Sequence, residues 1–162
     1  MNKEGHVLNA ALLGIGLGFV IEPSGTTETL RTVVAVTIPV TLGALFPDVD
    51  TAFGKHRKTL HNLPVLALFA AFPLAFDNLS YVWIGVLTHY VLDYLGSRRG
   101  IALFYPLSSQ EYGFPSGVTT SSRFANVVTV VVTGVELAAA VAIVHVLPGY
   151  VDAGSVAASL PI

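Results

Sequence analysis

The chain lacks cysteine and is poor in charge. Of its 162 residues only 11% are Asp, Glu, Lys or Arg, whereas 53% are hydrophobic, and the mean hydropathy is +0.71. A soluble domain carries about 25% charged residues, so this composition predicts a membrane protein of one domain. Without cysteine there are no disulfides and no thiolate metal ligands. A metal ion bound to this chain must therefore use His, Asp or Glu side chains.

The apolar residues form five separate stretches, so we predict an all-α integral membrane bundle of about five transmembrane helices. A spanning helix needs roughly 17–25 residues. The last stretch is long enough, the second and fourth are marginal, and the first and third need flanking polar residues such as His6 and Asn62 to face a protein interior. No cleavage site stands out after the first stretch, so we expect a retained helix. The predicted helices cover residues 7–21, 30–46, 63–76, 79–95 and 125–147, with a loop at 96–124.

The distribution of positive charge predicts the orientation of this bundle. With five spans, the N-terminus and the loops after the second and fourth spans lie on one side of the membrane. Lys and Arg accumulate on the cytoplasmic side of membrane proteins. We therefore expect a multi-pass protein of the cell (inner or plasma) membrane, with the N-terminus in the cytoplasm and the C-terminus outside. The opposite side would carry only Arg31, and the positive side would carry Lys3, Lys55, Arg57, Lys58, Arg98, Arg99 and Arg123.

Most of the histidines and aspartates fall in short clusters between the apolar stretches. The clusters read PDVD at 47–50, HRKTLH at 56–61 and HYVLD at 89–93, with His6 in front. The topology places all of them at the cytoplasmic end of the bundle. Imidazole and carboxylate groups at short spacings suit a divalent ion of the zinc type. We therefore expect His6, Asp48, Asp50, His56, His61, His89 and Asp93 to face one another at the inner membrane surface.

The pair His89 and Asp93 is four residues apart in a helical stretch, which stacks both side chains on one face. Such a pair suits two metal ligands, and a hydrogen bond between the two residues would give the same spacing. Ionisable residues inside a membrane segment are functional by default. Proximity to the other clusters favours the metal interpretation for this pair.

The two loop clusters leave more alternatives open. Asp48 and Asp50 could cap the segment that follows Pro47, but two carboxylates six residues before a histidine favour at least one ligand, and the pair could bridge two ions. His56 and His61 are five apart and do not share one straight helical face. One of them could bind metal while the other acts as acid or base.

Three arginines and one glutamate have a second interpretation. The positive-inside rule accounts for Arg57, Arg98 and Arg99, and each could also attract a substrate phosphate or a lipid headgroup. Glu136 stands in the last apolar stretch, where it must be protonated, hydrogen-bonded or functional.

The glycines at 14, 16 and 18 predict close helix packing and not a phosphate loop, since no strand precedes them.

Residues 5–106 together resemble the YdjM-like membrane-bound metal-dependent hydrolases. The resemblance rests on Gly5-His6, on FPDVD at 46–50, on HRKTLH at 56–61, on GVLTHYVLD at 85–93, and on Gly100 with LFYP at 103–106. That family is distantly similar to zinc-dependent C-type phospholipases. The resemblance implies an ion held by His6, an aspartate of PDVD, His61, His89 and Asp93. The chain after Leu107 carries no recognisable motif.

These observations lead us to expect an enzyme, a membrane hydrolase of phosphoesters such as a phospholipid or an isoprenoid phosphate. One or more Zn²⁺ ions would activate a bound water, and Asp50 or His56 would be the general base. The alternatives are a divalent-metal transporter and a non-catalytic scaffold stabilised by metal. The expected partners are the lipid bilayer and the substrate, with no nucleic acid.

Overall fold

The computed structural model describes residues 1–75, 79–115, 117–119 and 121–146. Within these residues the chain is helical, with two isolated β-bridges and no strand. The helices are α1 (Lys3–Ile21), α2 (Thr27–Leu45), α3 (Leu63–Ala70), α4 (Val82–Gly96) and α5 (Ala125–Val141), and a π-helical turn at Ala142–Val146 continues α5. Five helices are therefore confirmed. The predicted ends at Phe76 and Leu147 lie outside the described residues.

Three helices are long and apolar enough to cross a membrane, namely Lys3–Ile21, Thr27–Ala52 and Ala125–Val146. The third predicted span is a short helix, because α3 has only eight residues and covers about 12 Å of a hydrocarbon core roughly 30 Å thick. The number of spans and the orientation of the termini stay predictions. Most apolar side chains of α5 point outward, as expected for a helix in contact with lipid.

Side-chain caps lie at the beginnings of α1, α2 and α3. The Asn2 side chain accepts a hydrogen bond from the Gly5 backbone N–H at 3.0 Å, and Thr26 does the same for Glu28 at 3.3 Å. Asn62 caps α3 by accepting from Val65 at 3.1 Å. Such caps satisfy backbone donors that have no partner within the helix. They extend α1 and α2 by three or four residues beyond the apolar stretches predicted at 7–21 and 30–46.

Glycines bring the first two helices and α4 into close contact. A methyl group at Gly14 would lie 2.6 Å from the Thr37 Cα atom of α2, and one at Gly85 would lie 2.0 Å from the Val40 carbonyl oxygen. Only glycine permits such an approach, which is typical of helix packing in membranes. The predicted packing role of the glycines at 14 and 18 is confirmed, and Gly16 receives the Leu137 side chain of α5.

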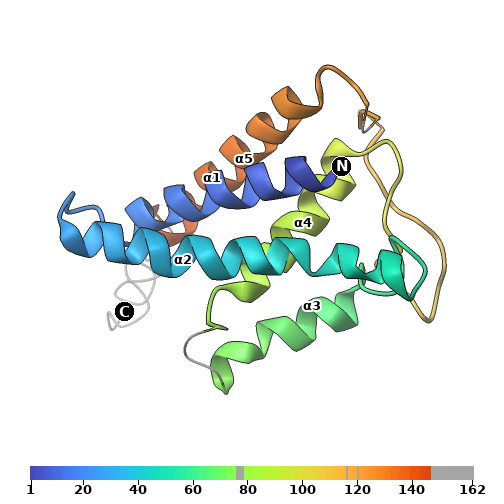
Figure 1. Ribbon diagram of the computed structural model, residues 1–162, viewed down its shortest axis with the longest axis horizontal. Helices are drawn as coiled ribbons and strands as arrows, with labels where there is room; N and C mark the ends of the chain where they lie inside the picture. Colours follow the sequence, from blue (N-terminus) through green and yellow to red (C-terminus); the bar gives the residue numbers. More distant parts are fainter. Residues whose placement is uncertain (76–78, 116, 120, 147–162) are drawn as a thin grey trace, which may run out of the picture.

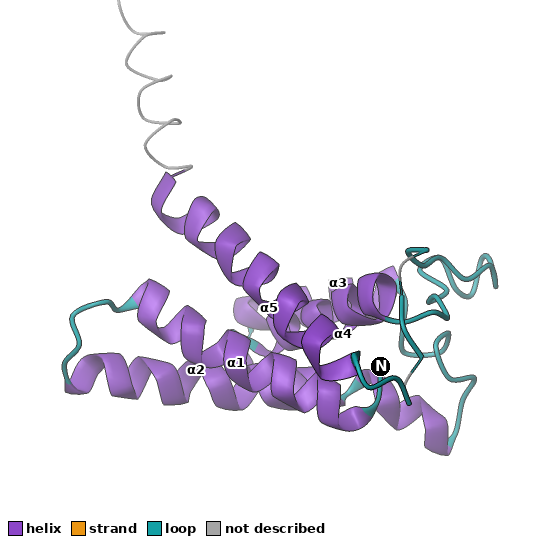
Figure 2. Ribbon diagram, turned by 90° about the horizontal axis from the view of Figure 1, so that it is seen from above, coloured by secondary structure: helices purple, strands orange, loops and turns teal. Residues whose placement is uncertain are grey.

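This packing gathers one end of every helix in the same region. The beginnings of α1, α3 and α5 and the ends of α2 and α4 lie together at the end of the bundle that carries the N-terminus (Figure 1). Seen from above, α5 rises obliquely from this region over α1 (Figure 2). The loops after α2 and α4 meet at the same end. There the Ala102 N–H of the second loop donates to the Arg57 carbonyl of the first at 2.9 Å.

Candidate metal centre

The predicted cluster residues meet at this end of the bundle. His6 comes from the first turns of α1, Asp48 and Asp50 from a 3₁₀ segment at Pro47–Ala52 that follows α2, and His89 and Asp93 from α4. The loop before α3 supplies His56 and His61. Five of the seven side chains are at least 99% buried, while Asp48 is 12% and His56 is 37% exposed. The convergence expected from charge and spacing is thus present in the structure.

Two imidazole nitrogens at the centre of the cluster each lie near two carboxylate oxygens. The Nε2 atoms of His61 and His89 lie 3.0 Å apart. The Asp48 Oδ1 atom is 3.8 Å from His61 Nε2 and 3.7 Å from His89 Nε2. Asp93 Oδ2 is likewise 3.8 Å and 3.7 Å from these two nitrogens. Two imidazole nitrogens and two carboxylate oxygens therefore form a compact set of donors.

The other nitrogen of each central imidazole is held by a hydrogen bond. His61 Nδ1 lies 3.0 Å from Asp50 Oδ2, and His89 Nδ1 lies 2.7 Å from the carbonyl oxygen of Ala44 near the end of α2. Both acceptors require the proton on Nδ1, which leaves the Nε2 lone pair available. Burial also lowers the pKa of His61, against the opposing effect of Asp50 and Asp93. The neutral imidazole that a metal requires is thus favoured at His61.

Asp50 connects the centre to the more exposed His56. Its Oδ1 atom accepts from His56 Nδ1 at 3.0 Å, and its Oδ2 atom accepts from the Leu60 backbone N–H at 3.3 Å as well as from His61. The prediction that Asp50 is a metal ligand is not tested, but both of its oxygens are engaged by protein donors. Asp48 Oδ1 lies 3.7–3.8 Å from the Nε2 atoms of His61 and His89, and it is 3.8 Å from His56 Nδ1.

His6 stacks on the central pair without a hydrogen bond of its own. Its ring lies 3.7 Å from the His89 ring with an angle of 10° between the planes. Its Nε2 atom is 3.4 Å from Asp93 Oδ1, yet neither ring nitrogen has a hydrogen-bond partner among the described residues. A buried polar group without a partner is costly. His6, His89 and Asp93 form one group that could hold a metal ion, and Asp48, His56 and His61 form another.

The buried Arg57 side chain joins the loop after α2 to Asp93 and to the loop after α4. Its guanidinium is buried and donates to Ser97 Oγ at 3.0 Å, to Asp93 Oδ1 at 3.5 Å and to the Arg99 carbonyl. Its backbone has a φ of 67°, in the left-handed region that costs a side-chain-bearing residue energy. The predicted phosphate contact of Arg57 stays untested, and its described partners are protein atoms. The amino group of Met1 also donates to Asp93.

The two other predicted arginines lie outside the cluster. Arg99 forms two hydrogen bonds with the Glu111 carboxylate at 2.8 Å and 2.9 Å, and Lys58 is 3.5 Å from the same group. The Arg99 hydrogen bond holds the pKa of Glu111 below its ordinary value. Arg98 is exposed, and its side chain has no partner in the described part of the chain.

Sequence reasoning missed three supports of this centre. The Tyr90 hydroxyl donates to the Leu60 carbonyl at 2.6 Å and accepts from the Asn62 N–H at 3.1 Å, which fixes the loop that carries His61. Ser97 and the Ala44 carbonyl complete the set. Tyr90 follows His89 directly, so its place beside the motif was the one available signal; a backbone carbonyl has no signature in a sequence.

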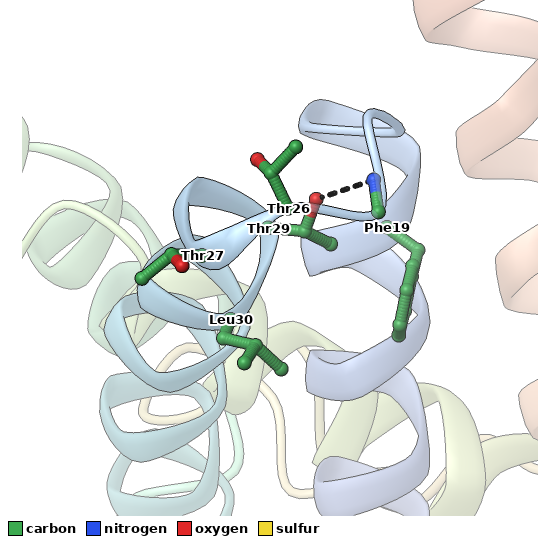
Figure 3. A pocket seen from close by; sticks show the side chains of 6 residues that line it. Phe19, Thr26, Thr27, Thr29 and Leu30 are labelled. Carbon is green, nitrogen blue, oxygen red and sulfur yellow. Dashed lines mark hydrogen bonds between the residues drawn. The ribbon is translucent and has the colours of Figure 1, made fainter.

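Two cavities lie apart from the cluster. One of about 490 Å³ is at the turn between α1 and α2, at the opposite end of these helices, and is lined by Phe19, Leu30 and polar residues of the turn (Figure 3). There the Thr29 hydroxyl accepts from the Gly25 N–H at 3.0 Å. The other, about 300 Å³ and apolar, lies between α3 and α4. Neither cavity is lined by a histidine or a carboxylate.

A helical bundle with candidate membrane spans and a buried group of His and Asp donors defines a class of membrane proteins with a candidate metal centre. A model of the YdjM inner membrane protein family matches residues 1–159. The chain belongs to this family, which confirms the resemblance drawn from the motifs. It also supports the predicted membrane location. No curated protein matches the chain, and no solved structure matches it either.

Proposed function

We propose that this chain is a membrane-embedded, metal-dependent hydrolase of phosphoesters. The observation that supports it most is the central set of His61 Nε2, His89 Nε2, Asp48 Oδ1 and Asp93 Oδ2. These groups come from three segments distant in sequence and converge with their lone pairs toward one another. Two imidazoles whose Nε2 lone pairs face each other at 3.0 Å have an energetic cost that a cation between them would remove.

The donor set fits an ion of the zinc type. Zinc binds imidazole nitrogen and carboxylate oxygen at about 2.0–2.2 Å, which separates tetrahedral ligands by roughly 3.3–3.6 Å. The nitrogen–nitrogen distance of 3.0 Å and the four nitrogen–oxygen distances of 3.7–3.8 Å lie on either side of that range. Both imidazoles also carry the Nδ1 hydrogen bond that orients histidine ligands in metal proteins. His6, whose Nε2 atom faces the Asp93 carboxylate at 3.4 Å, is the candidate for a further ligand or for binding a second ion.

The remaining residues would supply the rest of the reaction. A divalent ion in this set lowers the pKa of a bound water and neutralises phosphoryl oxygens. The Nδ1 atom of His56 donates to Asp50, which orients the His56 ring. Both oxygens of Asp50 accept from protein donors, so His56 is the better placed of the two predicted general bases. It is the most exposed histidine of the cluster and could pass the proton to solvent. The exposed Arg98 is available to attract the anionic group.

The location at the end of the helices favours an amphiphilic phosphoester. The cluster lies where membrane-spanning segments end, which is the depth of lipid headgroups if these helices span the bilayer. We therefore propose a phospholipid or isoprenoid phosphate as substrate, hydrolysed at the cytoplasmic face that the charge distribution predicts. The proposed orientation can be checked independently by labelling a single cysteine introduced in the loop after α2.

A pair of histidine variants tests the proposal. Detergent-purified wild type should contain zinc and cleave a phosphoester, while His61→Ala should lose most of both. The matched control is His145→Ala, because His145 is exposed in the π-helical turn after α5 and, among the described residues, bonds only to the Val20 carbonyl. Metal content is read by mass spectrometry and hydrolysis with phospholipid and soluble phosphoesters. A wild-type protein without divalent metal, or an active His61→Ala variant, would refute the proposal.

The same preparation separates the two alternatives. A scaffold with a structural ion would unfold when a chelator removes the metal, whereas a catalytic site would lose activity with a smaller change in thermal stability. A transporter would move metal into proteoliposomes, and this transport would depend on polar groups deeper in the bundle. Hydrolysis without transport supports the enzyme.

A further inference from the structure

A second polar cluster, with two of its three side chains buried, lies deeper in the bundle and contains none of the candidate metal ligands. It joins Asn9 of α1, Thr88 of α4 and Glu136 of α5. Asn9 and Thr88 are 1% and 2% exposed, and the surrounding helices are apolar. The cluster is therefore the one point at which these three helices share hydrogen bonds among the described residues.

The hydrogen-bond distances show that oxygen atoms crowd around one hydroxyl. Thr88 Oγ1 lies 2.6 Å from Asn9 Oδ1, and 2.7 Å and 2.8 Å from the two carboxyl oxygens of Glu136. Asn9 Nδ2 lies 3.1 Å from Glu136 Oε2. A threonine hydroxyl has a single proton to donate, whereas an ionised carboxylate and an amide oxygen can only accept.

An ionised Glu136 leaves this cluster one proton short. If Thr88 donates to Asn9 Oδ1, its oxygen faces Glu136 at 2.7 Å with no hydrogen between them. If the Asn9 amide is turned, its Nδ2 donates to Thr88, but its oxygen then faces Glu136 Oε2 at 3.1 Å, acceptor against acceptor. The orientation of an amide is an assignment, and both orientations lack the same proton.

A protonated carboxyl completes the network in the assigned orientation. Glu136 Oε1–H donates to Thr88, Thr88 donates to Asn9 Oδ1, and Asn9 Nδ2 donates to Glu136 Oε2. Each group then has a partner, and no charge is buried in the apolar part of the bundle, where a charge is costly.

We propose that Glu136 is a proton-binding site at neutral pH, and that its neutral carboxyl fastens α5 to α1 and α4. This inference does not depend on metal binding or hydrolysis. No other titratable group forms a hydrogen bond or an ion pair with Glu136 among the described residues. The titratable groups of the two helices packed against α5 are Lys3, Glu4, His6, His89, Tyr90, Asp93 and Tyr94.

Substitution by glutamine tests the proton directly, because glutamine has the shape of glutamic acid and the same donor and acceptor places. Glu136→Gln should unfold in detergent at the wild-type temperature, whereas Glu136→Ala should unfold at a lower one. The control is Glu28→Gln, since Glu28 is exposed and forms only a surface ion pair with Arg31 that is worth little. Destabilisation by Glu136→Gln as large as by Glu136→Ala would overturn the proposal.

Infrared spectroscopy gives a second readout if the alanine variant does not fold. The chain has five glutamates, at positions 4, 22, 28, 111 and 136, and ¹³C labelling of their carboxyl groups identifies the bands. The difference between wild type and Glu136→Gln at pH 7 should show loss of a protonated carboxyl band. Loss of a carboxylate band instead would mean that Glu136 is ionised.

Discussion

Asp50→Asn is the most informative substitution next to the candidate centre. The Asp50 carboxylate accepts from both His56 and His61 at 3.0 Å and holds the His61 proton on Nδ1. Asparagine keeps the volume but has one oxygen, and its amide can donate to Nδ1. That exchange would move the His61 proton to Nε2, the atom that faces His89, and would block its lone pair.

The expected loss of zinc affinity follows from the known effect of removing such a hydrogen bond. Loss of a hydrogen-bond partner behind a metal-bound histidine weakens metal affinity by roughly 10–100-fold, which corresponds to about 1.4–2.7 kcal/mol. Asparagine would also turn the His61 Nε2 lone pair into a donor, so we expect a value near the upper end, with zinc affinity measured by competition with a chromogenic chelator. Glu28→Gln, an exposed change at the other end of α2, should leave affinity unchanged. An Asp50→Asn variant with wild-type affinity would refute the tautomer argument.

Two further predictions concern the loops around the centre. Tyr90→Phe removes the hydroxyl bonded to Leu60 and Asn62 and should destabilise the fold by about 1–3 kcal/mol, measured by denaturant unfolding in detergent; unchanged stability would contradict the bracing role. Because Arg99 lowers the pKa of Glu111, the ion pair contributes above the ordinary glutamate pKa and is lost as pH falls through the lowered value. Protease resistance of the loop after α4 should therefore fall on acidification, and Glu111→Gln should abolish this pH dependence.

Helix positions were largely predictable because an apolar stretch is a local property of the sequence. The short α3 was not predicted as such, since hydropathy over 63–76 does not show where backbone hydrogen bonding stops. Pro73 cannot donate an intrahelical bond, and it falls in a short 3₁₀ segment at Phe72–Leu74 that follows α3. The structure also brings Gly43 and Gly85 close together beside Val40, an approach that glycine permits because it has no side chain.

The members of the site were predictable, but their individual arrangement was not. The spacing of His89 and Asp93 and the positive-inside rule placed the donors at one end of the bundle. The role of Arg57 depends on a left-handed backbone conformation, and that of Ala44 on a carbonyl freed near the end of α2. Both arise only when the helices pack, so no local pattern in the sequence announces them.

X-ray absorption at the zinc edge tests the central claim most directly. Detergent-purified wild type should show a shell of nitrogen and oxygen ligands at about 2.0–2.2 Å, with the outer-shell scattering of at least two imidazoles. His89→Ala should reduce the imidazole signal, and His145→Ala should not change it. A protein without zinc, or one whose zinc has only water-like oxygen ligands in both wild type and His89→Ala, would contradict the account.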